Sequence, residues 1–404
     1  MVIRSQYLQE LNKWKDKQVI KVITGIRRCG KSTLLQQFQD MLQQDGVSPD
    51  RIISLNFESL DNEALLDCKA LYSHVCERLH PTEKTYVFLD EIQMVADFQR
   101  AVDSLYIKDN VDLYITGSNA YLLSGELATL LSGRYIEINV LPLSFAEYCT
   151  FRNVSGDSAF AEYLRWGGMP YLASLDAEPQ QAEIYLEGIY NTILVKDIEL
   201  RQSRKESDPN KRKITDMTLL KNIARFLASS VGSPISVKSI ADYVTSAGRK
   251  VSQNTVSDYV EALVEPYIFY PVERFDVIGR QLLKQNQKLY IVDLGLRRHL
   301  LPRRDYDLGY SLENVVYFEL RRRGYKVNIG KVGAAEIDFV AQRDERLYYY
   351  QVTASLTEKS TFDREIAPLR AIRDNYPKTI LTLDRFTTGN YDGIEVVNAV
   401  DWLR

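Results

Sequence analysis

The chain is poor in the residues that most often build metal centres and disulfide frameworks. It has 404 residues with only four cysteines and three histidines. The cysteines, Cys29, Cys68, Cys76 and Cys149, form no C-x-x-C pair and no zinc-binding pattern. We therefore expect free thiols in a reducing compartment, the cytoplasm.

Long apolar runs and a charge excess are also missing. No run of 18 apolar residues occurs, so no membrane span is expected. The first 17 residues lack the apolar core of a secretory signal peptide. The 51 basic and 54 acidic residues nearly balance, at a net charge of −3, so the overall charge does not indicate a nucleic-acid binder. The apolar fraction of 45% is ordinary for a globular protein, and the length allows two to three domains.

The most informative run is GIRRCGKST at residues 25–33, a match to G-x-x-x-x-G-K-[ST]. It follows an apolar strand-like stretch and precedes a helix-like one, the context that gives this motif its meaning. Gly25 and Gly30 would let backbone N–H groups approach phosphate oxygens. Lys31 would reach the β- and γ-phosphates, and the Ser32 hydroxyl would bind Mg²⁺. The whole predicted nucleotide loop comprises Gly25, Ile26, Arg27, Arg28, Cys29, Gly30, Lys31, Ser32 and Thr33.

A second motif, TYVFLDEI at residues 85–92, reads as a buried strand that ends in two acids. Asp90 is placed to hold Mg²⁺, and Glu91 to act as the general base that activates water. Another apolar strand, residues 51–57, lies between the two motifs. An extra strand there, together with a Glu after the Asp, is typical of hydrolytic ATPases rather than GTPases.

Two further positions are candidates for contacts with the γ-phosphate. The strand at residues 111–116 is followed by Gly117, Ser118 and Asn119, and Asn119 would be a polar sensor. Arg134 precedes a fifth strand and could act on a neighbouring subunit's nucleotide. A solvated surface arginine is an equally weighted interpretation of Arg134.

The rest of the chain divides by pattern. We expect an ATPase core at residues 1–142 and a helical lid at 143–205, in which Arg165, Lys196 and Arg201 are candidates for nucleotide contact. Residues 206–290 resemble a winged helix, with Ser236 and Ser252 as N-caps and with strands at residues 268–275 and 288–292 flanking a wing. Its third helix has no Lys or Arg but carries acids, which favours a structural connector over a DNA reader.

Residues 291–404 have the order of a nuclease fold with altered chemistry. A helix with Glu313, a strand with Asp338 and a strand ending in residues 351–353 resemble the PD-(D/E)XK nucleases. Gln351 and Thr353 stand where an acid and a lysine are expected, and Glu313 and Asp338 alone make a poor Mg²⁺ site. Cleavage is therefore not expected, although the basic clusters at residues 297–304 and 321–323 could contact nucleic-acid phosphates.

Taken together, the runs GIRRCGKSTLL, FLDEIQ and ITGSNAYLLSGELATLLSGRYIEINVLPLSFAEY resemble the prokaryotic AAA-type ATPases of the AAA_14 class. WGGMPYL, KLYIVDLGLRR, SLENVVYFELRRRGYKV and EIDFV resemble their usual C-terminal partner, the domain of unknown function 4143. The resemblance implies an α/β P-loop NTPase core with a parallel sheet and helical lid, a winged-helix-like middle and a nuclease-like end. It assigns phosphate and Mg²⁺ roles to Lys31 and Ser32, and an arginine-finger role to Arg134.

We therefore expect a cytoplasmic, homo-oligomeric, Mg²⁺-dependent ATPase with no membrane partner. It would couple ATP turnover to a conformational change on or near nucleic acid, DNA rather than RNA. The alternative is a nucleotide switch, a signalling or defence scaffold whose slow hydrolysis times its assembly. Stimulation of turnover by nucleic acid would separate the two.

Overall fold

The computed structural model describes residues 2–118, 133–175, 178–193, 214–301 and 308–404. The chain forms two compact units, Met1–Leu141 with Glu265–Tyr267, and Pro142–Val264 with Ile268–Arg404. Asn119, Lys196 and Arg201 lie outside the described residues. Within the residues that are described, no helix combines the length and low polarity that crossing a lipid bilayer requires.

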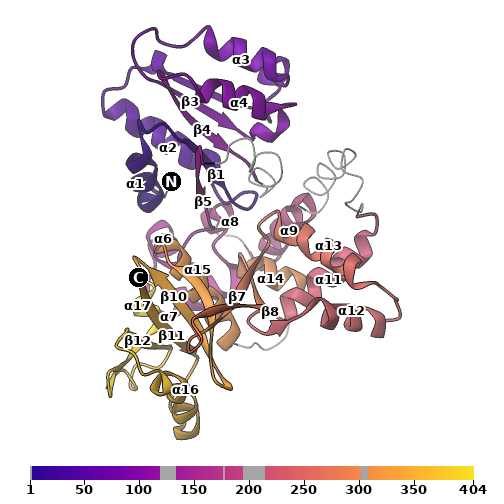
Figure 1. The fold of residues 1–404 in the computed structure, drawn as a ribbon, viewed down its shortest axis with the longest axis vertical. Coiled ribbons are helices and arrows are strands. Elements are labelled where there is room, and N and C mark those ends of the chain that lie inside the picture. Colours follow the sequence, from indigo (N-terminus) through magenta and orange to yellow (C-terminus); the bar gives the residue numbers. More distant parts are fainter. Residues whose placement is uncertain (1, 119–132, 176–177, 194–213, 302–307) are drawn as a thin grey trace. The chain divides into compact units, whose positions relative to one another are not determined.

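The first unit is built on a parallel sheet with the strand order β2-β3-β4-β1-β5 (Figure 1). Its strands are β1 (Ile20–Thr24), β2 (Ile52–Asn56), β3 (Thr85–Asp90), β4 (Val111–Thr116) and β5 (Tyr135–Asn139). β4 lies between β1 and β3, while β2, the strand expected between the two motifs, forms the edge. The predicted P-loop NTPase fold with a parallel sheet is confirmed. Because all strands run in parallel, the carboxyl ends of β1 and β3, where the two motifs lie, are on the same side of the sheet.

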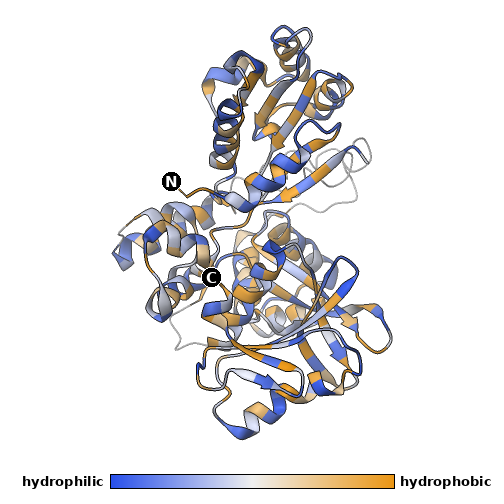
Figure 2. Ribbon diagram, turned by 90° about the vertical axis from the view of Figure 1, so that its left-hand side faces the viewer, coloured by the Kyte–Doolittle hydropathy of each residue, from blue (hydrophilic) through white to orange (hydrophobic). Residues whose placement is uncertain are grey.

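Helices cover both faces of this sheet. The described helices are α1 (Ser5–Trp14), α2 (Lys31–Gln44), α3 (Cys68–Cys76) and α4 (Phe98–Tyr106), with short 3₁₀ turns η1 (Pro49–Arg51), η2 (Leu60–Leu65) and η3 (Ile92–Met94). One face packs its aliphatic side chains against α3 and α4. On the other face, Phe38 of α2 contacts Phe88 and Tyr114, whose rings stack at 4.7 Å. The central strands β1, β3 and β4 are buried along their whole length and mostly hydrophobic (Figure 2), and the buried Lys21 of β1 pairs with Asp112 of β4.

The second unit is organised around a sheet in the order β13-β14-β12-β11-β10-β9-β7-β8-β6. Its strands are β6 (Pro234–Ile235), β7 (Phe269–Asp276), β8 (Gln281–Ile291), β9 (Lys326–Val332), β10 (Ala335–Arg343), β11 (Arg346–Thr353), β12 (Lys378–Thr382), β13 (Gly389–Tyr391) and β14 (Ile394–Asn398). The strands expected to form a wing, β7 and β8, therefore belong to the same sheet as the nuclease-like strands, through the parallel pairing of β7 with β9. The domain limits drawn from the sequence stay a prediction.

The second unit also contains helices, two of which begin at serine N-caps predicted from the sequence. They are α6 (Phe145–Arg152), α7 (Gly156–Trp166), α8 (Pro170–Ser174), α9 (Pro179–Thr192), α11 (Met217–Ser229), α12 (Val237–Ser246), α13 (Gln253–Val264), α14 (Leu294–Leu300), α15 (Leu308–Arg322), α16 (Lys359–Ala371) and α17 (Ala399–Trp402). Both predicted N-caps are confirmed, since the hydroxyls of Ser236 and Ser252 accept from Ser239 N–H and Thr255 N–H at 3.1 Å each.

Two glycine-containing motifs of the second unit pack directly on each other. The Asp293 carboxylate accepts from Gly168 N–H at 2.7 Å and caps α14. A Cβ at Gly167 would lie 2.2 Å from that carboxylate, and one at Gly295 would lie 2.3 Å from the Trp166 carbonyl. No side chain fits at either glycine, which explains the runs WGG and DLG in physical terms. Burial of Asp293 raises its pKa to about 6, although its backbone N–H donors oppose the shift.

Candidate nucleotide-binding site

The loop between β1 and α2 has the backbone of an anion-binding turn. Gly25 has φ 142°, and a Cβ there would meet the Val140 carbonyl at 2.1 Å, so only glycine fits. Arg28 and Gly30 also have positive φ, at 68° and 102°, and Gly30 is the N-cap of α2. Such alternation of backbone handedness is the geometry that turns N–H groups toward an anion at a helix N-terminus.

Arg4, just before α1, braces this loop from behind. Its guanidinium is only 4% exposed and donates to the Cys29 carbonyl at 3.3 Å and the Leu141 carbonyl at 2.9 Å. The Cys29 side chain is fully buried, and this burial raises the pKa of its thiol. Cys29 is therefore a packing residue rather than a reactive thiol. No sequence pattern indicates this role of Arg4, because its partners lie 25 and 137 residues away along the chain.

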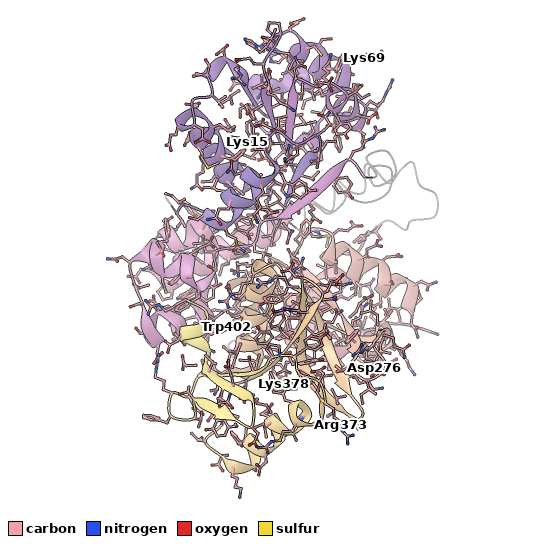
Figure 3. The ribbon with its side chains drawn as sticks, turned by 60° about the vertical axis from the view of Figure 1, so that its left-hand side comes forward. Lys15, Lys69, Asp276, Arg373, Lys378 and Trp402 are labelled. Atoms are coloured by element: carbon pink, nitrogen blue, oxygen red, sulfur yellow. The ribbon has the colours of Figure 1, made fainter. Side chains whose placement is uncertain are left out.

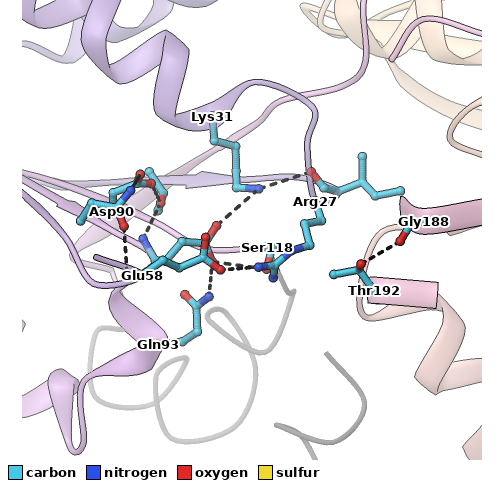
Figure 4. A network of polar contacts seen from close by, with 12 residues as sticks. Arg27, Lys31, Glu58, Asp90, Gln93, Ser118, Gly188 and Thr192 are labelled. Carbon is cyan, nitrogen blue, oxygen red and sulfur yellow. Dashed lines mark hydrogen bonds and ion pairs between the residues drawn. The ribbon is translucent and has the colours of Figure 1, made fainter. Parts of the chain in front are cut away.

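Lys31 lies over the loop and faces the acids of β3 (Figure 4). Its ammonium donates to the Gly25 carbonyl at 3.1 Å and the Ile26 carbonyl at 3.3 Å, and lies 4.0 Å from Glu91 Oε1. Ser32 and Thr33, which follow in the first turn of α2, are exposed. The structure thus brings the lysine of the first motif to the acid of the second.

The acid pair at the end of β3 is held by the neighbouring strands. The Asn56 amide donates to Asp90 Oδ2 at 3.0 Å from the end of β2. The Thr116 hydroxyl, at the end of β4, donates to Asp90 Oδ1 and accepts from Glu91 N–H at 2.9 Å. Thr116 therefore uses both its donor and its acceptor to fix the two acids relative to each other.

Glu91 itself adopts a left-handed backbone conformation, with φ 55°, that is uncommon for a non-glycine residue. Its carboxylate accepts from the Gln93 amide, and Ser118 Oγ lies 3.4 Å from the same oxygen. Asn56, Gln93 and Thr116 were not predicted. Their signal was available, since Asn56 and Thr116 end strands that flank β3, and the ends of parallel strands meet at one edge.

Arg27, within the loop, pairs with Glu58, which follows β2. The two side chains are 13% and 46% exposed, so the pair lies at the rim of the site. This contact links the phosphate loop to the segment after β2 and keeps the Arg27 charge next to the loop.

Arg134 lies away from the loop. It immediately precedes β5, whose start lies at the edge of the sheet opposite the ends of β1 and β3. Its guanidinium pairs with Asp103 of α4 and lies 5.6 Å from the centre of the Tyr106 ring. Arg134 therefore cannot serve the loop of its own chain, and a role at a neighbour's nucleotide stays a prediction.

We expect Arg134→Ala to leave ATP binding intact and to lower hydrolysis if the arginine acts between subunits. Asp103→Asn is the matched test of the internal ion pair, because it removes the partner but keeps the arginine. Turnover should fall in the first variant only, and mixing Arg134→Ala with Glu91→Gln protein should restore some activity. Equal behaviour of the two variants, together with a monomer in sedimentation, would assign Arg134 to the fold alone.

Several arginines expected at ligands are used in internal contacts. Arg297 is buried and donates to the Ala228 carbonyl at 3.0 Å and to Ser311 Oγ at 3.1 Å. Arg321 lies over the Tyr270 ring, and the Arg323 guanidinium lies 3.9 Å from the centre of the Trp402 ring. Arg165, the described lid candidate, lies over the Trp166 ring. Packing therefore engages these guanidinium groups, whereas Arg303 and Arg304 lie outside the described residues, so phosphate contact by the two clusters stays a prediction.

Of the two altered nuclease positions, Gln351 lies next to Asp338. Gln351 of β11 accepts from Asp338 N–H at 3.3 Å and donates to Glu365 at 2.7 Å. Thr353 donates to the Ser355 carbonyl at 3.2 Å. Neither side chain supplies the negative or positive charge that a metal-dependent nuclease needs at these positions.

Two family models match parts of the chain, and solved structures with related folds are known. The AAA domain family matches residues 17–149, and a domain of unknown function (DUF8612) matches residues 157–307, in place of the expected domain of unknown function 4143. Among solved structures, the Walker-type ATPase PABY2304 of Pyrococcus abyssi has a TM-score of 0.48 at 16% identity, covering 74% of this chain and 96% of its own. The Aeropyrum pernix Orc1 protein in complex with DNA has a TM-score of 0.31 at 13% identity, covering 74% and 92%.

Two full-length relatives are closer in sequence. An uncharacterised Haemophilus influenzae protein is 40% identical, covering 100% of this chain and 98% of its own. The uncharacterised protein MJ1544 of Methanocaldococcus jannaschii is 30% identical, covering 95% and 85%. The chain belongs to the same family as these proteins, and its N-terminal part is an AAA domain.

Proposed function

We propose that this protein binds and hydrolyses ATP with Mg²⁺ and couples turnover to a conformational change in its second unit. The observation that carries the proposal is the meeting of two motifs at one sheet edge. Lys31, from the glycine-rich loop, lies 4.0 Å from Glu91. Asp90 precedes Glu91, and its carboxylate accepts a hydrogen bond from the Thr116 hydroxyl. A phosphate cradle, a cation and two held acids are the parts that phosphoryl transfer to water requires.

Each residue has a role that follows from its chemistry. Backbone N–H groups of residues 25–33 would surround the phosphates, and Lys31 would leave its carbonyl acceptors to bind the β- and γ-phosphates. Glu91, fixed through its N–H and its carboxylate, would take the proton of the attacking water. Gln93 and Ser118 would orient that carboxylate.

The residues present also fit a magnesium ion. Mg²⁺ prefers oxygen ligands and keeps several waters, so one hydroxyl and one carboxylate from the protein suffice. Ser32 is exposed at the first turn of α2, and Asp90 lies at the same edge with its oxygens oriented by Asn56 and Thr116. The ion would neutralise charge on the phosphate oxygens during transfer.

Action on nucleic acid is the finer part of the proposal, with DNA preferred over RNA. Gln253 and Asn254 are exposed at the start of α13, where a winged helix would contact bases, but Glu261 of the same helix is exposed too. The internal use of Arg297, Arg321 and Arg323 favours the competing candidate, a slow nucleotide switch. An ATPase assay with and without duplex, branched and single-stranded nucleic acid decides between them. Stimulation supports action on nucleic acid, and unchanged turnover supports the switch.

The purified protein should not cleave nucleic acid in Mg²⁺ or Mn²⁺, because Gln351 and Thr353 supply no charge to a metal or to the attacking water. Binding, where it occurs, should weaken steeply with added salt, since it would rest on phosphate contacts. Gel assays of cleavage and salt titrations of binding check both parts. Metal-dependent cleavage that is lost in Asp338→Ala would contradict the first, and binding that ignores salt would contradict the second.

A further inference from the structure

A buried lysine lies among three carboxylates in the second unit. The ammonium of Lys288, on β8, is 2.8 Å from Glu336 Oε1, 3.0 Å from Glu313 Oε1 and 4.0 Å from Asp338 Oδ1. The lysine side chain is only 4% exposed, and that of Glu313 only 7%. Glu313 and Asp338 are two of the residues expected at a nuclease metal site, whereas Lys288 and Glu336 were not anticipated there.

The convergence of these side chains follows from strand geometry. Glu336 and Asp338 are two residues apart on β10 and so point to one face of the sheet, as do Lys288 and Tyr290 on β8. Helix α15 brings Glu313 to them, and Glu313 Oε1 also accepts from the Tyr290 hydroxyl at 2.6 Å. The Tyr290 ring stacks on the Tyr317 ring, with 4.5 Å between the ring centres, so aromatic surface borders the cluster.

We propose that the Lys288 ammonium occupies the place of a divalent cation in this nuclease-like fold and serves as its permanent structural cation. An ammonium holds carboxylate oxygens near 2.8–3.0 Å, whereas Mg²⁺ draws them to about 2.0–2.1 Å. The oxygens of Glu336 and Glu313 lie 2.8 and 3.0 Å from the Lys288 nitrogen, which is the spacing of an ammonium rather than of Mg²⁺.

The charges in the cluster support this assignment. Burial alone would lower the pKa of Lys288, but the nearby carboxylates outweigh it, so the pKa is raised and the lysine stays charged. Burial raises the pKa of Asp338, and the Glu313 charge raises it further. Three carboxylates buried together would be unfavourable without a counter-charge, and Lys288 is the central cation that offsets them.

The consequence is a fixed junction in place of a reaction centre. One nitrogen ties β8, α15 and β10 together, and because it is covalently attached it cannot exchange with solvent ions. Arg274 of β7 lies 3.7 Å from Glu336 and extends the junction by one strand. The nuclease-like part is then a binding or assembly module. In it, the position that a metal would take in a nuclease is filled by Lys288, which stabilises the fold.

The test is Lys288→Met in the full-length chain, followed by thermal unfolding without nucleotide, so that the result is independent of the proposed ATPase activity. Loss of the cation should lower Tm. Added Mn²⁺ should then restore part of the loss, by about 5 °C or more at saturation, because three carboxylates without a cation would bind it. The wild-type Tm should show no such rise. Lys326→Met, a change at an exposed lysine of β9, is the matched control and should behave as wild type.

Specificity is checked in the same background. Adding Asp338→Asn to Lys288→Met should abolish the rescue by Mn²⁺. If Lys288→Met does not fold, Lys288→Met with Glu336→Gln removes one negative charge and carries the same test. A folded variant without Mn²⁺ rescue overturns the proposal. So does wild-type cleavage of DNA in Mn²⁺ that disappears in Lys288→Met, since the lysine would then serve catalysis.

Discussion

Replacing Glu91 by Gln should lower ATP turnover on the order of 10²–10⁴-fold while ATP still binds. The amide keeps the shape of the carboxylate but cannot accept the proton of the attacking water. The backbone N–H of residue 91 keeps its bond to Thr116, so the loop and Asp90 should stay in place. Steady-state turnover and fluorescent-nucleotide binding, measured side by side, separate the lost chemistry from the retained affinity.

The matched control for this variant is Glu83→Gln, the same chemical change at a side chain that is 54% exposed and pairs with Arg51. It should leave turnover and binding near wild type. Near-wild-type hydrolysis in Glu91→Gln would show that Glu91 is not the general base. Loss of nucleotide binding in the same variant would instead make the carboxylate part of the phosphate-binding structure.

Lys31→Ala should abolish measurable nucleotide binding, with affinity weaker by roughly 10²-fold or more, equivalent to about 2.7 kcal/mol. The triphosphate would lose its principal side-chain cation, and a charge-assisted hydrogen bond is among the stronger polar contacts. The fold should survive, because the described hydrogen bonds of the Lys31 ammonium go to two carbonyls of its own loop, and its ion pair with Glu91 lies within the site. Calorimetric titration with a non-hydrolysable ATP analogue measures the loss directly.

Lys69→Ala is the control for charge, since Lys69 is an exposed lysine on α3 of the same unit (Figure 3). Its affinity for nucleotide should match wild type. Unchanged affinity in Lys31→Ala would refute the assignment of residues 25–33 as a phosphate loop, whatever the turnover shows.

Much of the ATPase core was predictable because its signals are local. The glycines, the lysine and the acid pair lie within two short runs, and alternation of strand-like and helix-like stretches implies a parallel sheet. The partners of these residues are less local. Asn56 and Thr116 follow from strand ends once the order of strands is known, whereas Arg4 joins residues up to 137 positions away and leaves no trace in the pattern.

The second unit shows the complementary difficulty. Strand-like alternation in residues 268–275 and 288–292 predicted strands, but periodicity does not specify which strand pairs with which. The parallel pairing of Arg274 with Ile329 and Phe275 with Gly330 depends on the three-dimensional approach of β7 and β9. Likewise, Lys288 precedes residues 291–404, the part expected to be nuclease-like. Its position among Glu313, Glu336 and Asp338 depends on how the strands pair in three dimensions.

The continuous sheet has a mechanical consequence. A hinge between β8 and the C-terminal strands would have to break the backbone ladder that joins β8, β7 and β9. Displacement of one of these strands would therefore be passed to its neighbours through peptide hydrogen bonds. If the proposed ATP turnover displaces one of these strands, the wing-like and the nuclease-like strands would therefore move together.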